Sequence, residues 1–114
     1  MRLDTLTLTS SNLQRSRAFY NGKLGFRVIE EGNAGFVVDA GGVKLQVDPI
    51  KVDRSKAPLI LIEPRLVFDT KELAARCTQL RDLGVSVDGP RRAADGQFAE
   101  LSDPDGHPIV LWEK

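Results

Sequence analysis

The sequence contains one cysteine and one histidine, two residue types that often carry nucleophilic and acid–base chemistry. Cys77 falls on an apolar helical stripe with Leu73 and Leu80, at positions i, i+4 and i+7. That position predicts a small core residue and not a nucleophile. His107 follows an Asp-Pro-Asp-Gly turn and is expected at a turn or strand edge. The pattern therefore argues against a Cys–His catalytic pair.

Oxygen-bearing side chains are the other candidates for chemistry. Glu100 and Asp48 would serve as general bases only if their carboxyl groups were buried. Thr5, Thr7 and Thr9 alternate with apolar residues, so they share one face of a strand. A row of polar side chains on a concave sheet face predicts a wet pocket. The alternative is an ordinary solvent-exposed sheet face.

Composition places the chain among soluble globular proteins. Of its 114 residues 41% are hydrophobic, and 16 basic residues balance 16 acidic ones. This balance gives no reason to expect nucleic acid as a partner. A single cysteine cannot form an internal disulfide, and no long apolar run suggests a signal peptide or a membrane span. We expect a cytoplasmic protein with no membrane partner.

The first half of the chain has the pattern of a strand, a helix and three further strands. These elements are expected at residues 3–9, 13–23, 26–29, 36–40 and 43–47. Ser10, Ser11 and Asn12 are helix N-cap residues, and Gly25 suits the left-handed position that ends a helix. Gly41-Gly42 predicts a tight turn between the last two strands.

The second half repeats this order. Its elements are expected at residues 65–69, 71–83, 85–87, 97–101 and 108–112. Thr70 is the expected helix cap, and Gly84 ends the second helix as Gly25 ends the first. Gly25 and Gly84 are 59 residues apart, and Gly42 and Gly106 are 64 apart, so the two halves align with few insertions.

The repeat predicts an α+β fold of two tandem βαβββ modules, with the helices on the outer face of the sheets. We expect one domain, residues 1–114. Module one would span about residues 1–50, a polar linker about 51–58, and module two about 59–114. Leu59 to Ile62 form a short apolar run that would extend a strand or pack at an interface.

Three motifs in this order resemble the glyoxalase, bleomycin-resistance and extradiol-dioxygenase superfamily, also called vicinal oxygen chelate proteins. The strand and helix start, Met1-Arg2-Leu3 through Asn12 to Ser16, resembles the first element of that superfamily. Ala18-Phe19-Tyr20 with Leu24-Gly25-Phe26, and Ser102 to His107 with Ile109-Val110-Leu111, resemble its helix end and final hairpin. The resemblance covers nearly the whole chain and implies sheets that curve into a cup. It does not specify an activity.

Metal-using members of the superfamily hold a divalent ion with four inward side chains, usually His, Gln or Glu. The resemblance places these positions at Thr5, Gln46, Arg65 and Val110, with Lys44 as the alternative to Gln46. Arginine is a permanent cation, and valine has no donor atom. Stable sites use several anionic or imidazole ligands. We therefore expect no metal, no other cofactor and no assignable catalytic residue.

The same positions suggest a ligand pocket. Arg65 would anchor a carboxylate or phosphate, or alternatively form an internal salt bridge to Glu100 or Asp48. Trp112 alternates with Val110 and would either stack on a flat ligand or pack at the module junction. The expected ligand-binding residues are Thr5, Thr7, Gln46, Arg65, Phe98, Val110 and Trp112.

We therefore expect a metal-free protein that binds a small aromatic or anionic molecule, and that resembles the antibiotic-sequestering branch of the superfamily. A metal-dependent lyase or dioxygenase is the enzyme alternative. A dimeric module that binds no small molecule is the structural alternative. The resemblance also implies a homodimer. The sequence does not identify the ligand.

Overall fold

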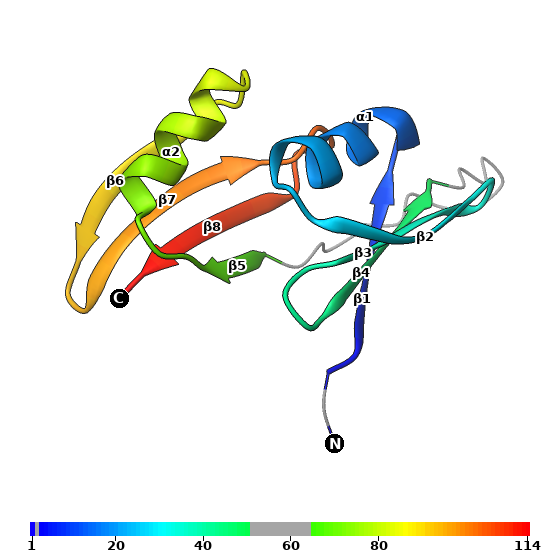
Figure 1. Ribbon diagram of the computed structural model, residues 1–114, viewed down its shortest axis with the longest axis horizontal. Helices are drawn as coiled ribbons and strands as arrows, with labels where there is room; N and C mark the ends of the chain where they lie inside the picture. The colour runs from blue at the N-terminus through cyan, green and yellow to red at the C-terminus, as the bar shows by residue number, and fades with distance from the viewer. Residues whose placement is uncertain (2, 51–64) are drawn as a thin grey trace, which may run out of the picture. The chain divides into compact units, whose positions relative to one another are not determined.

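The computed structural model describes residues 1, 3–50 and 65–114, and it divides into two compact units. We call residues 1 and 3–50 module one, and residues 65–114 module two (Figure 1). The expected linker and the apolar run from Leu59 to Ile62 lie outside the described residues.

Module one contains one strand, a helical segment and three further strands. Their bounds are β1 Thr5–Ser10, α1 Leu13–Arg17, η1 Ala18–Lys23, β2 Arg27–Gly32, β3 Gly35–Asp39 and β4 Lys44–Pro49. The sheet order is β1-β4-β3-β2, with β1 parallel to β4 and the other neighbours antiparallel.

Module two has the same order of elements and the same sheet topology. Its elements are β5 Leu66–Asp69, α2 Leu73–Asp82, β6 Asp88–Ala93, β7 Gly96–Ser102 and β8 Pro108–Glu113. The sheet order is β5-β8-β7-β6, and again only the pair β5–β8 is parallel. The predicted βαβββ repeat is therefore confirmed.

Each helix covers one face of its own sheet (Figure 1). Alternation along the strands directs one set of apolar side chains towards the helix. In module one Leu8, Val38 and Leu45 are at most 1% exposed, and Tyr20 of the helical segment η1 is fully buried. In module two Leu73, Cys77 and Leu80 from α2 are fully buried, as the apolar stripe predicted. The opposite face of each sheet is free of its helix and is called the open face below.

The helix boundaries follow local backbone chemistry. Asn12 is the N-cap of α1, and its side-chain oxygen accepts a hydrogen bond from the Arg15 N–H at 3.1 Å. The helix continues as wider π-type turns in η1. Gly25 and Gly84 then take φ angles of +78° and +87°, which glycine adopts without steric cost.

Two predictions for module two were wrong. Thr70 does not cap α2, because its hydroxyl donates to the Lys71 carbonyl. Instead the Glu113 carboxylate on β8 accepts the N–H groups of Glu72 and Leu73, at 2.6 and 3.3 Å. The expected strand at 85–87 also lies elsewhere, because β6 begins at Asp88. The Val85 N–H bonds to the Leu80 carbonyl instead, so this segment closes the helix end.

Candidate functional site

The open face of module one is polar. The register of β1 with β4 places Thr5 beside Lys44, Thr7 beside Gln46 and Thr9 beside Asp48. The Thr5 hydroxyl donates to Asp4 at 2.7 Å, and the Gln46 amide donates to Asp48 at 3.1 Å. The threonine row therefore lies among hydrogen-bonding side chains and not against the core.

An open depression of about 290 Å³ lies over β2, β3 and β4 in module one. Its polar lining includes Gln46, Asp48, Glu30 and Glu31, and Val37 contributes apolar surface. The Glu31 carboxylate pairs with Arg17 of α1, which ties this strand to the helix. Gln46 is the one sequence-predicted site residue that lines this depression.

The open face of module two is aromatic and apolar. Strand register places Trp112 beside Phe98 on β7 and beside Asp69 on β5. Val110 lies beside Val67 and Glu100 in the next row of the same face. Trp112, Phe98 and Val110 are all half-buried, whereas Val67 is 61% exposed. The structure therefore brings three of the predicted site residues together on one sheet.

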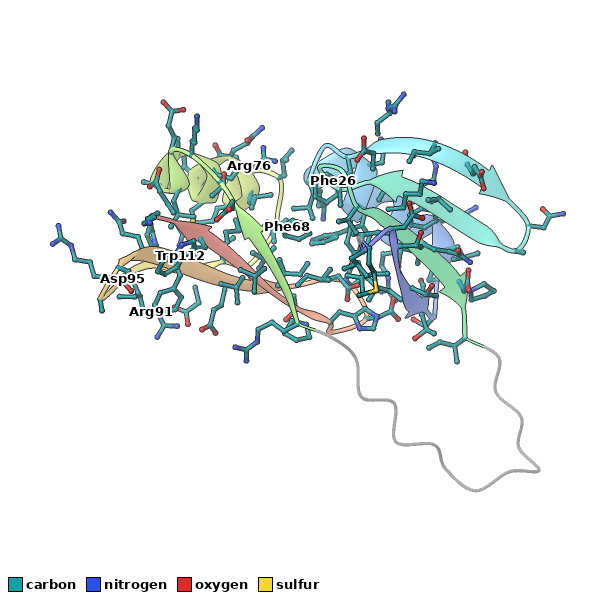
Figure 2. All side chains as sticks on the ribbon, turned by 90° about the horizontal axis from the view of Figure 1, so that it is seen from below. Phe26, Phe68, Arg76, Arg91, Asp95 and Trp112 are labelled. Atoms are coloured by element: carbon teal, nitrogen blue, oxygen red, sulfur yellow. The ribbon has the colours of Figure 1, made fainter. Side chains whose placement is uncertain are left out.

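Arg91 on β6 extends this surface and was not predicted from the sequence. Register pairs it with Phe98, and its guanidinium carbon lies 5.6 Å from the centre of the Phe98 ring. Its guanidinium also forms an ion pair with the Asp88 carboxylate. Figure 2 shows Trp112 and Arg91 on the side of the sheet away from α2. The sequence shows that Arg91 is cationic, but it does not show which residue of β7 Arg91 pairs with.

A second open depression, of about 640 Å³, lies beside Trp112 in module two. Its other lining residues are Asp69, Thr70, Lys71, Glu113 and Lys114. The Glu113 carboxylate accepts hydrogen bonds from the start of α2, and the Thr70 hydroxyl donates to the Lys71 carbonyl, so the Trp112 indole is the aromatic surface at this edge. Trp112 thus borders open space as well as its neighbours on the sheet.

Arg65 immediately precedes β5 and is exposed. Within the described residues of module two it forms no ion pair with Glu100, so that expected pairing is absent there. The alternative pairing of Arg65 with Asp48 stays a prediction. Because Arg65 is exposed as a residue, it is open to a role as a ligand anchor through its fork of N–H donors.

The four positions that the resemblance assigns to a metal ion carry unsuitable groups. Thr5 and Gln46 offer neutral donors that already engage neighbouring carboxylates, Arg65 is a cation and Val110 has no donor. Across residues 1, 3–50 and 65–114, no group of three or more His, Cys, Asp or Glu side chains is arranged to hold a metal ion. These residues do not fit a conventional divalent ion.

His107 and Cys77 have structural surroundings. His107 lies in the turn before β8, as predicted, and is buried with its ring nitrogen 3.8 Å from Asp103. The Asp103 carboxylate accepts the backbone N–H groups of Asp105 and His107, both at 2.9 Å, which fixes the turn. Cys77 is fully buried, and burial raises the pKa of its thiol, an effect that the Arg81 charge partly opposes.

No helix within the described part of the chain is long and apolar enough to cross a membrane. No curated protein sequence matches the chain significantly. Solved structures do match. TnmS3, an antibiotic binding protein from Streptomyces sp. CB03234, is 26% identical with a TM-score of 0.76, and the match covers 99% of this chain and 95% of that one.

Two further structures have comparable similarity. A glyoxalase/bleomycin resistance protein from Streptomyces sp. CB03234 is 28% identical with a TM-score of 0.70, covering 97% of this chain and 99% of the other. SMU.1112c is 26% identical with a TM-score of 0.83, covering 99% and 98%. A family profile matches residues 2–111. The chain therefore belongs to the Glyoxalase/Bleomycin resistance protein/Dioxygenase superfamily.

Proposed function

We propose that this chain is a small-molecule-binding protein without a conventional metal site, and that it holds a flat, partly apolar ligand. The observation that carries the proposal is the cross-strand pair of Trp112 and Phe98 on the open face of module two. Both rings are half-buried and lie on the sheet face opposite the helix. Paired aromatic side chains at a surface offer a large contact area for a planar ligand.

Polar contacts would come from the remaining predicted residues. Arg65 is exposed in module two and offers a bidentate fork to a carboxylate or phosphate. Thr5, Thr7 and Gln46 line the open face of module one and offer hydrogen bonds. Val110 supplies apolar contact beside Trp112. Arg65, Val110, Trp112 and Phe98 all belong to module two, so a ligand that is aromatic in one part and anionic in another would use this group of residues.

Antibiotic sequestration is the biological role that this site supports best. One structure that this chain resembles, at 26% identity, is described as an antibiotic binding protein. Binding a small molecule requires a concave surface and contacts but no reactive group. A binding role is therefore compatible with a site that lacks a set of metal ligands. We further propose that the protein acts in the cytoplasm as a homodimer and is not an enzyme.

Fluorescence titration tests the proposal directly, because Trp112 is the single tryptophan of the chain. Planar aromatic antibiotics should quench its emission and raise the melting temperature of the protein. Phe98→Ala should weaken the binding of such a ligand by about threefold to tenfold, the range expected for losing one aromatic contact. Leu83→Ala is the matched control, because Leu83 is 44% exposed and lies at the end of α2.

The proposal fails if no planar compound quenches Trp112 or shifts the melting temperature. Gel filtration in the same conditions then separates the alternatives. A dimer that binds no compound would favour a purely structural module. Binding that requires added metal would favour a lyase or dioxygenase.

A further inference from the structure

Three flat side chains lie at matching register on three adjacent strands of module two. Trp112 on β8 pairs with Phe98 on β7, and Phe98 pairs with Arg91 on β6. All three lie on the open face, and we call them the flat row. Indole, phenyl and guanidinium groups are each planar and each stack on aromatic rings.

Arg91 is held in place before any ligand arrives. Its guanidinium carbon is 5.6 Å from the Phe98 centroid, within the range of a cation–π contact. The Asp88 carboxylate, three residues earlier on the same strand, pairs with the same guanidinium. A side chain fixed by two contacts loses less conformational freedom when a ligand binds than a free arginine would.

The length of the flat row sets the size of the ligand. Neighbouring strands are about 4.8 Å apart, so the row spans about 10 Å from Trp112 to Arg91. A single benzene ring would contact only one or two members of the row. A ligand of three linearly fused rings, lying along the row, would contact all three.

We propose that Arg91 is a specificity-determining residue of the ligand site, and that the site selects electron-rich planar polycyclic aromatics over single rings. The inference rests on the proposed function, since it names the ligand class of that same site. Phe98 is the centre of the row, Trp112 is one end and Arg91 is the other. The guanidinium favours the electron-rich face of a ring, which is why the added ring contributes affinity at this end.

The test uses benzoate, 2-naphthoate and anthracene-2-carboxylate as probes, measured by isothermal titration calorimetry on the full chain. All three carry one carboxylate, so any general charge effect is the same across the series. The quantity compared between variants is the ratio of the dissociation constants of the two-ring and three-ring probes. The wild-type protein should bind the three-ring probe most tightly.

Arg91→Ala should reduce that ratio by about twofold to fivefold, the range of an exposed cation–π contact. Arg91→Lys keeps the positive charge but lacks the planar guanidinium group. It should therefore also reduce the ratio of the two dissociation constants, while leaving benzoate binding nearly unchanged. Arg92→Ala is the matched control, because Arg92 is the next residue on β6, is also exposed, and pairs with Gln97 instead of Phe98. It should leave the ratio as in the wild type.

Each outcome decides between the two proposals. Equal ratios in wild type, Arg91→Ala and Arg92→Ala overturn the role of Arg91 and leave the binding function standing. A uniform loss for all probes in Arg91→Lys, with an unchanged ratio, also overturns it. If the wild-type protein binds none of the three probes, the proposed function fails for this ligand class and the inference fails with it.

Discussion

The thiol of Cys77 is enclosed between α2 and its sheet. The residue is fully buried, and desolvation raises the pKa of the thiol above its ordinary value of 9.0, with the Arg81 charge opposing. A buried neutral thiol reacts slowly, because the thiolate is the reactive species and reagent cannot reach it. The residue therefore acts as a small apolar side chain.

We predict that Cys77 reacts with a thiol-specific disulfide reagent at pH 8 much more slowly in the folded protein than in denaturant. The raised pKa also has a consequence for stability. Well below pH 9 the thiol is neutral in both the folded and the unfolded state, so it contributes no pH dependence. Above the ordinary pKa the unfolded chain loses this proton first, so stability should fall as pH rises from there. Cys77→Ala should remove that dependence in urea titrations, and an unchanged slope would contradict this account.

Arg91 and Arg65 illustrate how far a single residue can be interpreted from the sequence. The alternation of strand β8 correctly placed Val110 and Trp112 on one face, and β7 placed Phe98 beside them. Arg91 was missed because β6 was expected three residues earlier, and only the paired register brings its side chain to Phe98. Opposite charge alone favoured an ion pair between Arg65 and Glu100. Within the described residues of module two the structure has no such ion pair.

At the scale of elements, the start of α2 depends on a strand far away in sequence. Glu113 accepts two backbone N–H groups at the helix start, and Glu72 at the N-cap has a φ of +55°. Such a cap joins residues 41 apart, so local sequence patterns favoured Thr70 instead. Local signals did identify Asn12, Gly25 and Gly84, because those caps bond only within their own turns.

Glu113→Ala should lower the free energy of unfolding by about 1 kcal/mol, because it leaves two helix N–H groups without their acceptor. Glu72→Gly should instead raise it by about 1 kcal/mol, because glycine adopts the left-handed conformation without strain. Urea denaturation measures both changes. Destabilisation by Glu72→Gly would show that its side chain makes a contribution larger than the strain.

The helix ends allow a second paired comparison. Gly84 has a φ of +87° and Gly22 has an ordinary negative φ, and a Cβ built at either position meets no atom within 4 Å. An alanine side chain would therefore clash with no neighbouring atom at either position, and the two positions differ only in backbone conformation. Gly84→Ala should destabilise the protein by about 1 kcal/mol, whereas Gly22→Ala should be neutral or stabilising by about 0.5 kcal/mol. Equal effects in urea melts would refute the conformational explanation.

At the scale of the whole molecule, one strand order occurs twice with different chemistry on the two open faces. Module one carries threonines, Gln46 and acids, whereas module two carries Trp112, Phe98 and Arg91. The two modules share a topology in which each sheet presents the same buried alternation to its helix. The open faces carry no such constraint and differ in chemistry, so the sequence predicted the repeat far better than the ligand.

Metal content is the prediction that separates this chain from the enzymes of its superfamily. At the positions that the resemblance assigns to a metal ion, Thr5, Gln46, Arg65 and Val110 supply no anionic ligand, and the Arg65 cation repels a divalent ion. The purified protein should contain well under one equivalent of zinc, nickel, iron or manganese by elemental analysis. Its melting temperature should not rise with added metal or fall with chelator.

The decisive control restores a ligand set. Arg65→His with Val110→Glu places an imidazole and a carboxylate at two of the four positions, both of them in module two. This variant replaces a cation and an apolar side chain with two metal-ligand types, so we predict a metal-dependent rise in melting temperature that the wild type lacks. Stoichiometric metal in the wild-type protein would instead mean that donors outside these four positions hold an ion, and it would return the lyase and dioxygenase chemistry to consideration.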